Sequence, residues 1–390
     1  MFNFVMDYQL DIIGVIFLSF LAVSFLVQMV YYLMYYTKPI GYQKRKNNRM
    51  SDTINNNPPV SIIICSRNES QNLLHFLPSV LEQDYPQYEV IVVNDGSTDE
   101  SEVVLNTFEK KYKHLYNTYI PEGSKYLSRK KLAMTVGIKA AKHDIILFTE
   151  ACCEPITKDW ISQMSRHFTE KRSIVLGFSP LANSKSLSTK FAVYNNLIDG
   201  LQYLSLAISN HPYRGVGRNM AYKKSLFFGN KGFSKYMHLQ FGEDDLFINQ
   251  VATKENTIVE IASDSLVKTH LESFSMWKEM RLCQATTQQY YKSGSVAFWR
   301  LESWSHFIFI VAFVATMVYG ISSFLLFITA VLLFLIRMIV QLFVINKAAQ
   351  KLAVEKFYYT LPLFDIFLLF FNISISFRRL MRGKKDYTWN

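Results

Sequence analysis

Two stretches of sequence, PPVSIIICSRNES (58–70) and EVIVVNDGSTDES (89–101), decide the fold. Each opens with an apolar run rich in valine and isoleucine and closes with polar residues. A run that is apolar at every position is typical of a strand covered on both faces, as at the centre of a parallel sheet. Between the two runs, residues 70–83 place leucines and a valine at helical spacing. The order strand, helix, strand predicts an α/β fold with a parallel sheet.

The same alternation continues along the chain. A helical segment at 100–112 precedes a short strand near 115–120, and the helical SRKKLAMTVGIKAA (128–141) precedes an apolar run at 144–149. The carboxyl ends of parallel strands meet at one edge of a sheet, where ligands bind in a crevice. Polar residues follow three of these strands, at Ser66 to Glu69, Asp95 to Ser97 and Glu150 to Glu154.

The crevice lacks the two commonest phosphate-binding patterns. No Walker A loop is present and no GxGxxG follows the first strand, which argues against a P-loop NTPase and a dinucleotide-binding domain. The stretch IILFTEACCEP (145–155) could form a metal site, a redox pair or an altered nucleotide site. Adjacent cysteines seldom bridge, and none of the four cysteines has zinc-like spacing. The convergence of three polar strand ends favours the nucleotide site.

Apolar segments lie at both ends of the chain. Residues 12–36 carry no charge and exceed the roughly 20 residues that cross a bilayer as a helix. Tyrosines and the basic KPIGYQKRKNNR (38–49) follow them, which indicates an uncleaved anchor whose N-terminus is outside. Residues 306–321 and 323–345 predict a helical hairpin, in which Arg337 should face protein or snorkel.

A third apolar stretch, 357–377, contains Pro362, Asp365 and Asn372 and precedes the basic FRRLMRGKK. We expect a re-entrant or interfacial segment that leaves this basic tail inside, with a full crossing as the alternative. The net charge of +11 comes largely from such membrane flanks, so membrane topology and attraction to anionic lipid explain it. We expect no nucleic acid partner. The expected location is the cell membrane, with the middle domain facing the cytoplasm.

Five motifs occur in a fixed order over about residues 60–280. They are PPVSIIICSRNES, EVIVVNDGSTDES, a strand ending in acids, GVGRNMAYKKSLFF (215–228) and FGEDDLFIN (241–249). Together with the flanking membrane segments, they resemble the membrane-bound branch of the inverting family 2 glycosyltransferases. The resemblance implies a GT-A fold, a Rossmann-like α/β domain that binds a nucleotide sugar, here with uridine as the expected base.

The sequence therefore divides into six expected regions. They are an N-terminal transmembrane anchor (1–40), a basic linker (41–58), a GT-A domain (59–270), interfacial amphipathic helices (271–304), a transmembrane hairpin (305–346) and a third membrane segment with a basic tail (357–390). The aromatic residues of 271–304 suit the membrane interface, and packing against the GT-A domain is the alternative.

The resemblance assigns binding roles to the strand ends. It implies that Ser66, Glu69 and Asp95 surround the base and ribose, although helix capping and turn formation also explain the two acids. Arg67 could contact phosphate or lie on the surface. Arg129, Lys130 and Lys131 begin a helix, where positive charge opposes the helix dipole and a bound anion would compensate.

Lys130 and Lys131 match the family's lysines and are expected at the diphosphate, with a solvated charge run as the alternative. The family carries Asp-x-Asp at the third strand end, and its second aspartate binds a divalent metal. Here Glu150-Ala151-Cys152 stands in that place. A thiol is a poor ligand for Mg²⁺ or Mn²⁺. Metal binding could use Glu150 and Glu154, lysines could act alone, or the site could be degenerate.

The acids of FGEDDL (241–246) suit proton transfer. The resemblance implies that Asp244 is the general base on an acceptor hydroxyl, with Glu243 and Asp245 orienting it or capping the next helix. Capping alone is the alternative. In the glycine-rich GVGRNM (215–220), Arg218 and Asn219 are candidates for hydrogen bonds to sugar or acceptor, and a tight turn would also explain the glycines.

Processive members carry Gln-x-x-Arg-Trp after the base. In WKEMRLC (277–283), Met280 and Cys283 stand where the glutamine and arginine would be, which favours transfer of a single sugar. The sequence thus predicts an inverting, membrane-anchored transferase that moves a sugar from a nucleotide-sugar donor to a lipid-linked or envelope-glycan acceptor. The alternative is a non-catalytic relative that binds a nucleotide or a partner protein.

Overall fold

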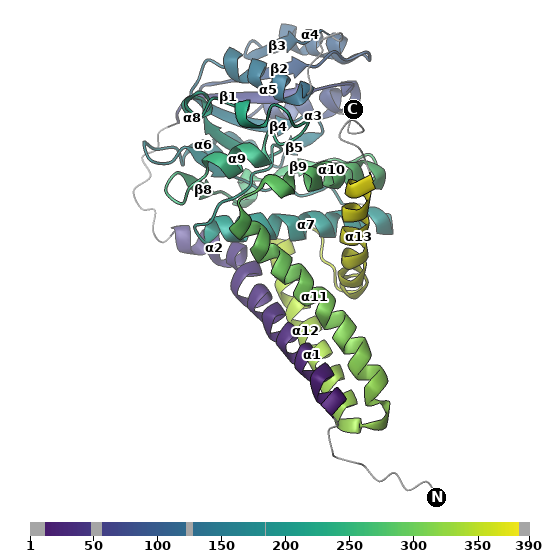
Figure 1. Ribbon diagram of the computed structural model, residues 1–390. Helices are drawn as coiled ribbons and strands as arrows, with labels where there is room; N and C mark the ends of the chain where they lie inside the picture. Colours follow the sequence, from purple (N-terminus) through teal and green to yellow (C-terminus); the bar gives the residue numbers. More distant parts are fainter. Residues whose placement is uncertain (1–11, 48–56, 122–127, 184, 382–390) are drawn as a thin grey trace, which may run out of the picture.

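A seven-stranded sheet with the order β3-β2-β1-β4-β7-β6-β8 forms the centre of the α/β domain (Figure 1). The computed structural model describes residues 12–47, 57–121, 128–183 and 185–381. The strands β1 to β4 are parallel, and β7 runs antiparallel to both β4 and β6. They span β1 Val60–Ser66, β2 Tyr88–Asn94, β3 Leu115–Tyr119, β4 Ile145–Glu150, β6 Ile174–Leu176, β7 Met220–Lys223 and β8 Thr257–Val259.

Helices cover both faces of this sheet. Helices α3 (Ser70–Leu81) and α4 (Ser101–Lys111) pack on one face, and α5 (Arg129–Ala140) packs on the other. Neighbouring residues of β1 alternate between the two faces, since Ile62 contacts the α3 side and Ile63 contacts the α5 side. The predicted alternation of parallel strands and helices is therefore confirmed, as is the α/β fold class.

The second half of the domain adds shorter elements. A small antiparallel sheet pairs β5 (Cys153–Pro155) with β9 (Val267–Thr269). The remaining helices are α6 Trp160–Ser165, α7 Leu187–Ile208, α8 Lys224–Gly229, α9 Asp245–Val251 and α10 Phe274–Thr287. Short 3₁₀ turns lie at Ser234–Tyr236, Ser263–Ser265, Gln288–Tyr290 and Gly320–Ser322.

In the part of the chain that the structure describes, four helices are long and apolar enough to cross a membrane. The first is α1 (Ile12–Val30), which continues through a π-helical segment, Tyr31–Tyr36, into α2 (Lys38–Asn47). The others are α11 Ser293–Tyr319, α12 Phe324–Lys351 and α13 Leu361–Met381. Helices α11 and α12 form the predicted hairpin. Because α11 begins at Ser293, the expected boundary between residues 304 and 305 falls inside a continuous helix.

Helices α1, α11 and α12 form one bundle that extends away from the α/β domain, and α13 stands beside it (Figure 1). The C-terminal end of α13 meets α10, where Arg379 donates a hydrogen bond to the carbonyl of Ala285 at 3.3 Å. The basic end of α13 thus lies next to the α/β domain. This position suits a segment that leaves the tail on the side of that domain.

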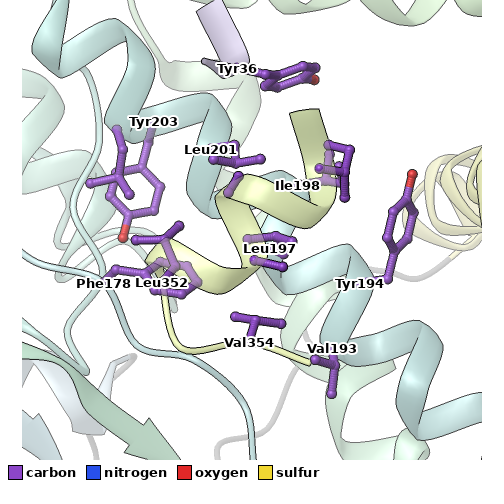
Figure 2. Packing of buried hydrophobic residues seen from close by; sticks show 14 of the residues in the cluster. Tyr36, Phe178, Val193, Tyr194, Leu197, Ile198, Leu201, Tyr203, Leu352 and Val354 are labelled. Atoms are coloured by element: carbon purple, nitrogen blue, oxygen red, sulfur yellow. The ribbon is translucent and has the colours of Figure 1, made fainter. Parts of the chain in front are cut away.

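A continuous apolar core joins the α/β domain to the bundle. Figure 2 shows side chains of α7, among them Tyr194 and Leu197, packing close to Leu352 and Val354, which follow α12. Tyr36 at the end of the first membrane helix belongs to the same cluster. Because these residues are almost fully buried, the position of the domain on the bundle is fixed by packing.

Candidate active site

A cavity of about 610 Å³ lies at the carboxyl ends of β1 and β4. Its wall on the sheet side includes Arg67, Glu69 and Glu150, and its opposite wall is formed by α10. The segment that leads into α9 supplies Glu243 and Asp244. The cavity therefore occupies the position that the polar strand ends predict.

Lys130, at the start of α5, holds two of these acids together. Its ammonium nitrogen lies 2.8 Å from Glu150 Oε1 and 3.2 Å from Glu243 Oε1. Burial alone would lower the pKa of Lys130, but the two carboxylates outweigh it and raise that pKa well above its usual value. Lys130 is therefore a cation at neutral pH, placed where a ligand in the cavity can reach it.

Asp244 is fixed by backbone groups on both carboxylate oxygens. The N–H of Gly217 donates to Oδ2 at 2.8 Å, and the N–H of Asp245 donates to Oδ1 at 2.7 Å. Gly242, with φ +105°, allows the sharp turn before these acids, and a Cβ there would lie 2.5 Å from the Leu246 side chain. Asp244 is half-buried and lines the cavity, so an acceptor hydroxyl could reach its carboxylate.

Asp245 is buried and is held from the far side by α10 and the turn after it. The hydroxyls of Thr287 and Tyr291 both donate to its Oδ2, the latter at 2.6 Å. Burial and the neighbouring Asp244 carboxylate raise the pKa of Asp245 to about 6. Asp245 thus ties the segment before α9 to the cover of the cavity.

The predicted nucleoside residues divide into two groups. Arg67 and Glu69 line the cavity, and burial raises the pKa of Glu69. Ser66 and Asp95 are buried beside the cavity and are not part of its lining. The Asp95 carboxylate pairs with Arg129, whose Nη2 lies 2.7 Å from Oδ1. A ligand would have to displace Arg129 to use Asp95.

Lys131 points away from the cavity, contrary to the expectation from the lysine motif. It is fully buried, and its ammonium donates to the carbonyls of Tyr236, Leu239 and Phe241 at 2.7 to 2.8 Å. Consecutive helical residues are about 100° apart around the axis, so Lys130 and Lys131 cannot share one face. Lys131 holds the loop that leads to Glu243.

Arg218 and Asn219 also differ in whether they reach the cavity. The amide of Asn219 donates to the carbonyls of Phe178 and Ser265, and its oxygen accepts from the indole N–H of Trp160. These contacts occupy Asn219 inside the fold. Arg218 lines the cavity.

The acids and thiols at the end of β4 do not match the expected metal ligands. Ligand atoms of Glu150, Cys152 and Cys153 lie within 4.8 Å of one another, and Glu154 does not belong to this group. Because side chains alternate along β5, Glu154 turns outward and meets His270 at 3.0 Å. Glu154 therefore does not join Glu150 as the predicted pair of metal ligands.

Mg²⁺ and Mn²⁺ prefer oxygen ligands, and this group offers one carboxylate and two thiols. The carboxylate, Glu150, is already paired with Lys130. A hydrogen bond to Cys153 and burial raise the pKa of the Cys152 thiol, which keeps it protonated. The residues at this strand end therefore do not fit a hard divalent ion.

Sequence reasoning missed a second charged cluster in the cavity wall. Asp199 of α7 accepts from Arg214 at 2.7 Å and from Arg281 of α10 at 2.6 Å. Burial would raise the pKa of Asp199, but the two arginines hold it well below its usual range. A lone acid in the otherwise uncharged stretch 197–206 was the available signal.

Three comparisons with known proteins bear on this site. Residues 61–228 match the profile of Glycosyl transferase family 2. The chain is 25% identical over 154 residues to a poly-beta-1,6-N-acetyl-D-glucosamine synthase of Staphylococcus epidermidis, covering 38% of this chain and 32% of that protein. It is 40% identical over 65 residues to a 4,4'-diaponeurosporenoate glycosyltransferase of Staphylococcus aureus, covering 16% of this chain and 17% of that protein.

Among solved structures, a mannosyltransferase from Pyrobaculum calidifontis, in complex with GDP-Man and Mn²⁺, matches with a TM-score of 0.59 and 17% identity. The match covers 95% of this chain and 99% of that one, and it shows a shared fold. The aligned segments span about a third or less of the curated relatives. The profile match covers the strands and strand ends that form the cavity floor, so residues 61–228 form a glycosyl transferase family 2 domain.

Proposed function

We propose that the chain is an inverting, membrane-anchored glycosyltransferase that moves a sugar from a UDP-sugar to a hydroxyl of a lipid-linked or envelope-glycan acceptor. The carrying observation is the position of Asp244, whose two oxygens are held by backbone N–H groups at the edge of the cavity. Lys130 and the strand ends lie in the same cavity and supply the place for the donor.

In this proposal the donor's nucleoside lies against Arg67 and Glu69, and its diphosphate lies near Lys130. The acceptor hydroxyl hydrogen-bonds to Asp244, which takes its proton as the oxygen attacks the anomeric carbon. The bond from that carbon to the diphosphate breaks on the opposite face, which inverts the configuration. The nucleoside diphosphate leaves with the bonding electron pair, and a cation nearby stabilises its charge.

The helices that border the cavity support a lipid-linked acceptor. Helix α10 closes one side of the cavity and packs against α13, whose apolar side chains Phe367 and Phe370 are exposed. A lipid-borne acceptor could approach along this path from the membrane. The two relatives named above are a polysaccharide synthase and a glycosyltransferase whose name specifies diaponeurosporenoate, so both a glycan and a lipid acceptor remain in the proposal.

Single-sugar transfer and orientation complete the proposal. Met280 and Cys283 line the cavity at the place where processive relatives carry glutamine and arginine, which supports transfer of one sugar. The α/β domain is proposed to face the cytoplasm, because the basic flank that follows α1 and the basic end of α13 both lie on its side of the bundle.

The test is a screen of nucleotide sugars for thermal stabilisation of the purified full-length protein, followed by transfer assays with the donors that bind. We expect one or a few UDP-sugars to raise the melting temperature and to be consumed when a membrane lipid extract is added. No stabilisation by any nucleotide sugar would contradict the proposal.

A second candidate is a non-catalytic nucleotide-binding protein. The observation that favours it is the replacement of the expected aspartate by Cys152 at the cavity wall. Tight UDP binding without turnover of any donor, with lipid or glycan acceptors present, would establish this second function.

A further inference from the structure

The residues at the end of β4 do not offer the oxygen ligands that would hold Mg²⁺ or Mn²⁺ beside the donor's diphosphate. Glu150 is paired with Lys130, and the two nearby ligand positions are thiols. A nucleoside diphosphate nevertheless needs positive charge, both to bind and to leave. If the cavity binds a nucleotide sugar as proposed above, side chains of the cavity wall must supply this positive charge.

Lys130 is the first source of charge. An ammonium has three N–H donors, and contacts to Glu150 and Glu243 account for two of them. The two carboxylates keep Lys130 protonated and hold its nitrogen at the cavity wall. Its third N–H could donate a hydrogen bond to a phosphate oxygen.

Arg218 is the second source. It is only 6% exposed, and its Nη2 donates to Asn196 of α7 at 3.3 Å. Its guanidinium carbon lies 6.0 Å from the ring centre of Trp277 in α10. Within the described residues, Nη1 is buried and has no hydrogen-bond partner. A buried guanidinium that is positioned from two sides and keeps an unused donor is the arrangement expected of an oxyanion site.

Arg218 lines the same cavity as Glu150 and Cys152 at the β4 end. Together with Lys130 it lowers the pKa of Glu150 against the opposing effect of burial. Both side chains line the one cavity, and together they carry two positive charges, the charge of one Mg²⁺ or Mn²⁺ ion.

We infer that Lys130 and Arg218 bind the donor's diphosphate in place of a divalent cation, so that nucleotide binding by this chain needs neither Mg²⁺ nor Mn²⁺. Cys152 marks the loss of the metal ligand, and Arg218 is the compensating residue. This inference rests on the proposed function. The competing chemistry is a thiophilic ion such as Zn²⁺ on the two thiols and Glu150, which the test below separates.

The experiment is calorimetry of UDP binding to the full-length protein in detergent, with EDTA, with Mn²⁺ and with Zn²⁺. We expect dissociation constants in the three conditions to agree within about twofold, because no ion contributes. Binding that disappears in EDTA and returns with Mn²⁺ would overturn the inference, and binding that returns only with Zn²⁺ would establish the thiophilic ion instead. Both results would leave the proposed function intact, whereas no UDP binding in any condition would remove both.

Substitutions test whether Lys130 and Arg218 supply the positive charge that binds the diphosphate. Lys130→Met and Arg218→Gln should each weaken UDP binding at least tenfold in EDTA, and the matched control Lys139→Met, on the exposed side of the same helix, should not. Unchanged binding in Arg218→Gln would contradict its role.

Cys152→Asp should create the missing oxygen ligand, so that Mn²⁺ strengthens UDP binding about tenfold or more. The control Cys283→Asp places the same carboxylate on α10 in the same cavity and should show no Mn²⁺ effect. Equal Mn²⁺ responses in the two variants would show that position 152 does not face the diphosphate, against the inference.

Discussion

A cluster of charged side chains at the cavity and another in the membrane bundle differ in which hydrogen-bonding atoms they leave without partners. In the bundle, Arg337 of α12 pairs with Asp365 of α13 at 2.7 Å, and Asp365 also contacts His306 of α11 at 3.2 Å. Arg337 donates to Gln28 of α1 at 3.2 Å. Each of the four long apolar helices contributes at least one side chain to this bundle cluster.

The bundle cluster is closed to ligands. Its residues are almost fully buried, and none of them lines the cavity at the strand ends. Within the described residues, Arg337 Nε is the one buried side-chain atom of Arg337, Asp365, His306 and Gln28 without a partner. The expectation that Arg337 faces protein is confirmed.

The cavity cluster of Lys130, Glu150 and Glu243 differs from the bundle cluster in two ways. It lines a cavity, and Glu243 Oε2 and the nearby Arg218 Nη1 are buried without partners in the described part of the chain. Buried charge by itself therefore does not mark a functional site. Buried charge that adjoins a cavity and keeps unused hydrogen-bonding atoms does.

The largest expected effect on stability is in the bundle. Arg337→Met leaves the Asp365 carboxylate without its cationic partner, so we expect a loss of about 3–5 kcal/mol in the free energy of unfolding. Thermal unfolding in detergent micelles measures it, and UDP affinity of the folded fraction should change less than twofold. The double variant Arg337→Met/Asp365→Leu should recover most of the loss. A tenfold change in UDP affinity would break the contrast between the clusters.

The neighbours Lys130 and Lys131 sharpen the contrast within the α/β domain. Lys131→Met leaves three carbonyls, each buried or partly buried, without their charged donor, and we expect a loss of about 3 kcal/mol in stability. Lys130→Met should instead act mainly on UDP binding. The measurement is denaturant unfolding of both variants beside UDP calorimetry, and equal losses of stability would contradict the assignment.

The smallest expected effect is a pH dependence from Asp245. Its pKa of about 6 in the folded protein exceeds the unfolded value of about 3.9, so the folded state binds the proton more tightly. The stability from this group is full below about pH 4 and is lost as pH rises through about 6, with about 1 kcal/mol lost between pH 5 and pH 8. Asp245→Asn should remove that component, which unfolding at the two pH values measures. An unchanged pH slope would show that Asp245 is ionised throughout.

Local sequence patterns were enough to predict the helices and strands, but they did not predict where every side chain points. The apolar runs at Val60–Ser66 and Tyr88–Asn94 specify buried parallel strands, because few other structures bury both faces of a run. The hairpin of α11 and α12 follows from length and composition in the same way. These features depend on residues close together in sequence.

The side-chain positions that differ from the sequence-based expectation depend on contacts between distant segments. The outward direction of Glu154 is set by pairing of β5 with β9, more than 100 residues away. The direction of Lys131 depends on where the loop 236–241 lies, and Asp95 is covered because Arg129 folds back onto it. Asp199 and Arg281 meet only once α7 and α10 pack together. None of these contacts leaves a periodic pattern in the sequence.

The central claim is that Asp244 takes the acceptor's proton in a cavity that binds the donor. The most direct measurement is transfer rate and UDP affinity of Asp244→Asn, beside the control Asp159→Asn at an exposed helix start. We predict a fall in rate of about 10²- to 10⁴-fold for Asp244→Asn, with UDP affinity within about threefold of the parent protein. Transfer by Asp244→Asn at more than about a tenth of the parent rate would contradict the account.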